Sequence, residues 1–198
     1  MVRHQPQEVR QLQILEAAMK VCSEKGYHAA RIDDIASAAG LSKGSVYHHF
    51  SSKQEVFIGV MEHMLAEVAE FVEALDGKTR AGDAVRAAMD YMVQILDHQP
   101  ALIRGLMELY LLGMRDPAFR QRFAAYYDAL VSALEKVLAH GIERGELRPG
   151  TNANEVARVL CMGGDGLVFI NFVLEEDRAG ADLLALTNLI LTAIEVPA

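Results

Sequence analysis

The sequence has few of the features that accompany secretion or a membrane. Its 198 residues include two cysteines, Cys22 and Cys161, both inside apolar helical patterns, so we expect buried free thiols rather than a disulfide or a metal site. The N-terminal sequence MVRHQPQEVRQLQ lacks the apolar core of a signal peptide. The longest nearly apolar run, residues 183–194, is too short to span a bilayer. We therefore expect a cytoplasmic protein with no membrane partner.

Signatures of catalysis are also missing. The chain contains no Walker, Rossmann, zinc or nucleophile-elbow motif. Adjacent residues on a helix point roughly 100° apart, so the pairs Asp33-Asp34 and His48-His49 cannot converge on one atom. Asp33-Asp34 is better explained as favourable charge in a first helical turn. We expect no enzyme activity, no metal and no cofactor.

Positive charge is scarce outside the N-terminal part. The net charge is −8, yet residues 1–54 hold seven Lys or Arg against five Asp or Glu, while the remainder holds twelve against twenty-two. A basic region is the electrostatic requirement for holding DNA phosphates. We therefore expect phosphate binding in a domain of residues 1–54, and solvent, ligand and subunit contacts in a domain of residues 55–198.

The segment 31–50, RIDDIASAAGLSKGSVYHHF, has the pattern of a helix-turn-helix. Apolar residues from Ile32 to Ala39 recur at helical spacing, and Gly40 permits a sharp turn. Ser42 is a suitable N-cap for a second helix over about 43–49. That helix turns Val46 inward and presents its polar side chains to a DNA groove.

A further helix is expected to begin near Lys53, because Ser52 and Glu55 form a capping box. A cation in the first turn opposes the helix dipole and needs a partner. We expect a DNA phosphate to be the partner of Lys53.

The N-terminal 57 or so residues resemble the DNA-binding domain of the TetR family of bacterial transcription regulators. The resemblance rests on ordered motifs at the family's spacing: Gly26-Tyr27, Asp34-Ile35-Ala36, Ala39-Gly40, Ser42-Lys43-Gly44, Tyr47-His48-His49-Phe50 and Lys53. The sequence departs from the family at Ala30-Arg31, where threonine or serine is usual. The resemblance implies phosphate contacts from some of these residues and base-edge contacts from others. The expected DNA-binding residues are Arg31, Ser42, Lys43, Gly44, Ser45, Tyr47, His48 and Lys53.

The rest of the chain is predicted to be helical throughout, giving an all-α fold of nine helices. Gly26 should end the first helix, and Gly180 should separate the last two. The remaining boundaries follow from caps, prolines and glycines. Beyond the two short helices of segment 31–50, the expected helices cover 7–25, 53–75, 83–98, 100 onward, 117–144, 154–177 and 180 to the C-terminus.

In the TetR family the last two helices pack against those of a second subunit as a four-helix bundle, which implies a homodimer that reads a palindromic operator. The last two helices of this chain carry more apolar surface than a small body needs to bury. The alternative is that they complete a monomeric core. The expected interface residues are Leu160, Gly163, Gly164, Leu167, Leu186, Leu189 and Ile190.

Residues 108–174 more distantly resemble the ligand domain of the betaine-responsive repressor type. A small-molecule effector is therefore expected, although each candidate residue is by itself more typical of core packing than of a ligand contact. Arg104 and Arg158 are the only cations placed nearby, which disfavours a strongly anionic effector. The predicted ligand-binding residues are Met61, Met64, Met89, Met92, Met107, Glu108, Tyr110, Tyr126, Phe169 and Asn171, with Tyr91, Tyr127, Phe172 and Asp165 in the same apolar surroundings.

The combined interpretation is a repressor that binds double-stranded DNA as a dimer and is released by an apolar or aromatic effector. The recognition helix carries no Arg or Gln to read a base in bidentate fashion, so specificity should rest partly on DNA shape. The alternative is a helical ligand-binding or scaffolding dimer without operator-specific DNA binding.

Overall fold

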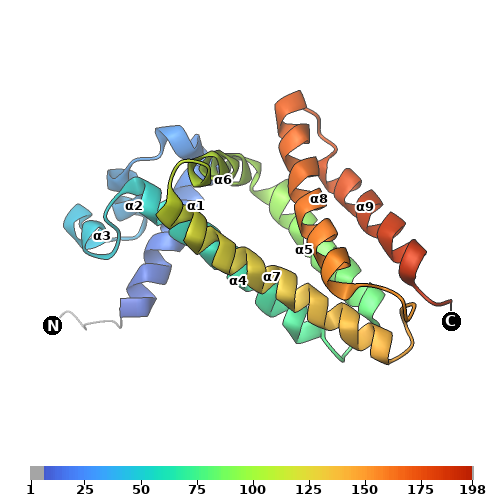
Figure 1. Ribbon diagram of the computed structural model, residues 1–198. Helices are drawn as coiled ribbons and strands as arrows, with labels where there is room; N and C mark the ends of the chain where they lie inside the picture. The colour runs from blue at the N-terminus through green and yellow to red at the C-terminus, as the bar shows by residue number, and fades with distance from the viewer. Residues whose placement is uncertain (1–6, 198) are drawn as a thin grey trace. The chain divides into compact units, whose positions relative to one another are not determined.

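The protein is all-α, as predicted (Figure 1). The computed structural model describes residues 7–197, apart from the side chains of residues 108, 109 and 111–113. In that part of the chain the backbone forms nine helices and one isolated antiparallel bridge, between Leu147 and Glu195. The helices are α1 (Gln7–Ala29), α2 (Ile32–Ala38), α3 (Lys43–His49), α4 (Lys53–Leu75), α5 (Ala81–His98), α6 (Pro100–Gly113), α7 (Pro117–Glu143), α8 (Ala153–Leu174) and α9 (Ala179–Ile194).

The helices divide into two compact units. The first contains the described residues up to Met64 together with Gln99–Arg120, and the second contains Leu65–His98 and the described residues from Gln121 onward. Helix α6 joins the first unit because it packs on α1. At Gly105 a β-carbon would lie 2.6 Å from Cβ of Tyr27, so only glycine permits this approach. The expected division into a DNA-binding domain of residues 1–54 and a domain of residues 55–198 concerns function rather than packing, and it stays a prediction.

The first unit is built on α1, whose apolar stripe supports the helix-turn-helix. Ile14, Ala18 and Cys22 of this helix have no exposed surface. The predicted break at Gly26 is present as a left-handed residue, with φ 77°. The helix nevertheless regains one turn beyond this break and ends at Ala29 rather than at Lys25.

In the second unit α8 and α9 lie side by side, and α9 also packs on α5 (Figure 1). The break between α8 and α9 is at Glu175, which adopts a left-handed conformation with φ 55°. The prediction that Gly180 separates them is wrong, because Gly180 lies in the first turn of α9. A β-carbon there would lie 2.9 Å from Cγ1 of Val93 on α5, so this glycine serves close helix packing.

Other helix boundaries agree with the sequence, and one differs for a tertiary reason. Asp116 caps α7 by accepting the N–H groups of Ala118 and Phe119, as expected. Helix α5 begins at Ala81 instead of Asp83, because the Glu146 carboxylate accepts the Ala81 N–H at 2.7 Å. Capping from a distant loop residue leaves no signal in the local sequence.

Helix α8 is longer than the apolar run 183–194, which was judged too short to span a bilayer. Within the described residues it is the one helix whose length and mean hydropathy of 1.6 would allow a membrane crossing. Core helices of soluble proteins can have the same length and hydropathy, so this one helix is weak evidence for a membrane span. Cys22 and Cys161 are both buried, as predicted, and neither forms a disulfide within residues 7–197.

Candidate functional site

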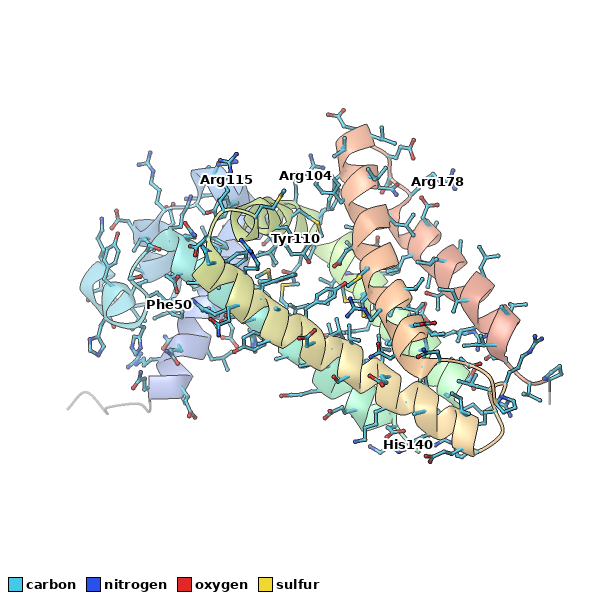
Figure 2. The ribbon with its side chains drawn as sticks, viewed as in Figure 1. Phe50, Arg104, Tyr110, Arg115, His140 and Arg178 are labelled. Atoms are coloured by element: carbon cyan, nitrogen blue, oxygen red, sulfur yellow. The ribbon has the colours of Figure 1, made fainter. Side chains whose placement is uncertain are left out.

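The helix-turn-helix has the geometry that its sequence predicts. Gly40 takes φ 65° at the turn, and the Ser42 hydroxyl accepts the N–H of Ser45 at 3.1 Å to begin α3. Val46 is fully buried beneath α3. Phe50 ends the helix (Figure 2), and its ring covers the backbone of Gly59 on α4. The outer face of α3 is thereby held in a defined orientation on the first unit.

That outer face carries most of the predicted DNA-binding residues. Tyr47 is 47% exposed although it is a large aromatic residue, and an exposed aromatic side chain on a recognition helix is suited to packing against a sugar-phosphate backbone. Ser45 is half-buried, and Lys53 also lies half-buried at the start of α4. The exposed members of the predicted set are Arg31, Ser42, Lys43, Gly44, Tyr47 and His48.

Two acidic residues at the start of α2 partly neutralise this face. Asp33 accepts a hydrogen bond from Lys43 at 3.0 Å, which raises the pKa of the lysine. Asp34 pairs with Lys25 at 2.8 Å, and that hydrogen bond lowers the pKa of its carboxyl group. A DNA phosphate would therefore have to compete with Asp33 for the ammonium group of Lys43.

Lys53 has partners within the protein, although the sequence argument gave it only a DNA phosphate. Its ammonium group donates to the carbonyl oxygens of Tyr27, His28 and Ala30, at 2.8, 3.3 and 3.1 Å. These carbonyls lie at and just beyond the end of α1, where a helix leaves its acceptors without internal partners. In the structure the partner of Lys53 is therefore this end of α1. A phosphate contact by Lys53 stays a prediction and would have to displace one carbonyl.

Side-chain hydrogen bonds from α1 to the turn between α2 and α3 involve residues that were not predicted. Arg10 donates to Gln13 at 2.8 Å, and Gln13 donates to the Ala39 carbonyl oxygen at 2.6 Å. At the other end of α3 the buried Nδ1 of His49 has no hydrogen-bond partner among the residues that the structure describes. Burial, with the nearby charges of His48 and Arg10, lowers the pKa of His49. No local motif marks these residues, because they act across helices.

The predicted ligand-binding residues are distributed over both units. Met61, Met64, Met107 and Tyr110 belong to the first unit, whereas Met89, Met92, Tyr126, Phe169 and Asn171 belong to the second. The side chain of Glu108 lies outside the described residues.

Two predicted ligand residues of the second unit are partly exposed, and a third is buried between α8 and α9. Tyr126 and Phe169 are 37% and 41% exposed. Asn171 is buried against α9, where its amide donates to the Leu167 carbonyl and to Asp182 at 3.0 and 3.1 Å. Helical periodicity groups residues by face, but it does not tell which face meets which neighbour.

A better polar candidate in the second unit is the pair of Tyr127 on α7 and Asp165 on α8. The Tyr127 hydroxyl lies near the Asp165 carboxyl group and favours its charged form, and the Tyr127 ring lies against Phe123 with centroids 5.4 Å apart. Burial raises the pKa of Asp165 to about 6, and the nearby Tyr127 hydroxyl only partly opposes this rise. Burial and the Asp165 charge also raise the pKa of Cys161, one turn away, to about 12. A carboxyl group in such apolar surroundings could bind a hydrogen-bonding group of a ligand.

The predicted dimer residues fall into two groups. Leu160 is 1% exposed, and β-carbons at Gly163 and Gly164 would lie 2.9 Å from Leu186 and Leu183 of α9. These contacts join α8 to α9 within one subunit. Leu167, Leu186 and Ile190 are half-buried, and Leu189 is 73% exposed. Another stripe of α8 is apolar and exposed to solvent. It comprises Val159, Met162, Phe169, Ile170 and Val173, of which Val159, Met162 and Ile170 were not predicted.

Comparisons with known proteins agree with these features of both units. Residues 14–60 match the family model described as bacterial regulatory proteins of the tetR family, and residues 88–182 match the tetracyclin repressor-like C-terminal domain. The fatty acid metabolism regulator protein of Bacillus subtilis is 26% identical over 183 residues, covering 91% of each chain. The second match shows the family's C-terminal domain, while the finer resemblance to the betaine-responsive type stays a prediction.

Solved structures show the same fold. SmeT, the repressor of the Stenotrophomonas maltophilia multidrug efflux pump SmeDEF, has a TM-score of 0.71 at 24% identity, with 95% of this chain and 91% of that chain covered. The regulator FadR from Bacillus subtilis, solved in complex with stearoyl-CoA, has a TM-score of 0.66 at 24% identity, with coverages of 91% and 95%. With a helix-turn-helix of the expected geometry and family matches in both its N-terminal and C-terminal parts, the chain belongs to the TetR family of bacterial DNA-binding transcriptional regulators.

Proposed function

We propose that this regulator is a repressor that binds a palindromic operator as a homodimer and leaves it when an apolar effector occupies the second unit. The observation that carries the DNA-binding part is the exposed polar and aromatic face of α3, fixed on a buried Val46. A repressor is favoured because SmeT, which shares the fold, is described as one.

The homodimer is supported by the stripe on α8 that is apolar yet exposed. At about 100° per residue its members fall within an arc of roughly 100°, which places them on one side of the helix. Ile170 and Val173 are 50% and 61% exposed, and Leu189 of α9 is exposed as well. Burying such a stripe against its copy through a two-fold axis would remove apolar surface from water and set the spacing of two recognition helices.

The effector is proposed to be mainly apolar, with one hydrogen-bonding group that meets the pair Tyr127 and Asp165. This pair is supported by its apolar surroundings, which include the Phe123 ring. The solved complex of FadR with stearoyl-CoA gives one precedent for a long apolar ligand on this fold. A carboxylate at the site favours a donor group on the effector over an anionic one.

The proposal is tested by selecting DNA from a random-sequence pool with the purified protein, and then measuring affinity for the selected duplex across a salt series. We expect enrichment of a palindrome, binding of a dimer, and a steep loss of affinity with salt. A panel of fatty acids, acyl-CoAs, amines and phenols is then added. One class should release the duplex, and Tyr127→Phe should weaken that release.

Two outcomes contradict the proposal. Selection that enriches no sequence would favour the alternative of a ligand-binding or scaffolding dimer without operator-specific DNA binding. Release by acyl-CoA alone, undiminished in Tyr127→Phe, would remove Tyr127 and Asp165 from the effector site and leave the repressor itself in place.

A further inference from the structure

Two hydrogen bonds connect α1 to the turn of the helix-turn-helix. Nη1 of Arg10 donates to Oε1 of Gln13 at 2.8 Å, and Nε2 of Gln13 donates to the carbonyl oxygen of Ala39 at 2.6 Å. Ala39 is the C-cap of α2, and the next residue, Gly40, turns the chain toward α3 with φ 65°. The connection therefore ends at the peptide where the backbone changes direction.

The Ala39 carbonyl is an acceptor that α2 cannot satisfy. It belongs to the last turn of the helix, where carbonyl groups have no internal donors, and Ala39 is only 6% exposed. A buried carbonyl needs a donor from elsewhere in the protein, and Gln13 supplies it. The turn is thus tied directly to a side chain of α1.

Arg10 determines which way the Gln13 amide points. A guanidinium group only donates, so the amide oxygen must face Arg10 and the amide nitrogen must face Ala39. Without Arg10 the amide could rotate and present its oxygen to the carbonyl, which would be repulsive. Arg10 is also close enough to His49, in the last turn of α3, to contribute to its electrostatic environment.

We infer that Arg10 and Gln13 are positioning residues for operator recognition, which fix the orientation of α3 without touching DNA. The inference rests on the operator binding proposed above. Base-edge hydrogen bonds require donor–acceptor distances near 2.7–3.2 Å, so a small rotation of α3 weakens them. Contacts to phosphates, which are longer-ranged and less directional, tolerate such a rotation better.

The test compares Arg10→Met and Gln13→Met with wild type on two duplexes. One duplex is selected by the wild-type protein from a random pool, and the other is a scrambled duplex of equal length. We expect each variant to lose roughly five- to tenfold in affinity for the selected duplex and less than twofold for the scrambled one. The salt slope should not change, because no phosphate contact is lost.

Three control variants make the result specific. Lys43→Ala, at a predicted phosphate contact, should weaken binding to both duplexes and reduce the salt slope by about one. Arg10→Lys keeps a donor for Gln13 and should recover most of the affinity. The double variant Arg10→Met with Gln13→Met should lose no more than Gln13→Met alone, since both act through one chain of hydrogen bonds.

Several results would overturn the inference. A reduced salt slope in Arg10→Met would make Arg10 a phosphate contact, and additive losses would separate the two residues. Equal losses on both duplexes, or a loss of α1 helicity that accounts for the weaker binding, would leave only a structural role. Arg10→Met leaves the Gln13 side chain in place beneath the turn, so this variant remains informative even if Gln13→Met does not fold. If the selection enriches no sequence, the proposed function itself is contradicted. The inference about Arg10 and Gln13 then fails with it, because there is no operator recognition to support.

Discussion

The ammonium nitrogen of Lys53 lies 2.8 Å from the carbonyl oxygen of Tyr27 and 4.5 Å from the centroid of the Tyr27 ring. One side chain therefore joins the start of α4 to the end of α1 by a charge-assisted hydrogen bond and a cation–π contact. The Tyr27 ring in turn meets Phe57 of α4 edge to face, with centroids 5.0 Å apart. These contacts fasten α4 to α1, the helix that supports the helix-turn-helix.

Replacing Lys53 by methionine should destabilise the first unit by about 1–3 kcal/mol, because three carbonyls near the end of α1 lose a shared donor. Thermal or urea denaturation followed by circular dichroism measures the change. Lys20→Met, an exposed substitution on α1, is the matched control and should change stability by less than about 0.5 kcal/mol. Unchanged stability in Lys53→Met, with affinity for DNA lost, would return Lys53 to a purely phosphate-binding role.

Replacing Asp33 by asparagine should strengthen DNA binding by a few-fold at low salt. The change frees Lys43 from its ion pair at 3.0 Å and removes a negative charge from the proposed phosphate-facing surface. Fluorescence anisotropy at several salt concentrations measures the effect, which should shrink as salt screens the charges. Asp97→Asn, on an exposed residue of α5, is the control, and equal strengthening there would attribute the effect to net charge alone.

Replacing Ile170 by glutamate should convert the proposed homodimer into a monomer, because it places two like charges in an apolar interface. Analytical ultracentrifugation at micromolar concentration measures the oligomeric state. Met114→Glu changes a residue that is 76% exposed and lies outside the α8 stripe, so that variant should remain dimeric. A wild-type protein that sediments as a monomer would contradict the interface before any variant is made.

Replacing Asp165 by asparagine should stabilise the second unit at pH 7.5 and have little effect near pH 3, below the unfolded pKa of 3.8. The raised pKa of Asp165, about 6, means that the folded protein binds the proton more tightly than the unfolded chain. Its contribution to stability is therefore full below the unfolded pKa and is lost as the pH rises through about 6.

The difference at pH 7.5 should approach about 2–3 kcal/mol, since each pKa unit corresponds to about 1.4 kcal/mol. Urea denaturation at both pH values measures it. Asparagine keeps an acceptor for the Tyr127 hydroxyl, so the comparison isolates the charge. A destabilised Asp165→Asn protein at pH 7.5 would show that the carboxylate is well compensated in the folded state.

The sequence by itself determined the features that depend on local rules. Periodicity, the Ser42 and Asp116 caps, and the glycine turn at Gly40 predicted α3 and the starts of α4, α6 and α7 correctly, because a helix begins and ends through groups within a few residues of its terminus. The motif order around residues 26–53 was sufficient for the family. The same rules predicted the direction of Val46 and the burial of both cysteines.

Tertiary structure alone decided features that join residues far apart in the chain. The bond from the Ala81 N–H to Glu146 moved the start of α5, and close packing on Val93 placed Gly180 inside α9. Carbonyl oxygens near the end of α1 give Lys53 partners within the protein. Periodicity also did not determine which apolar face of α8 packs on α9 and which is exposed to solvent. A repeating pattern defines the faces of a helix, but the free energy of packing chooses their neighbours.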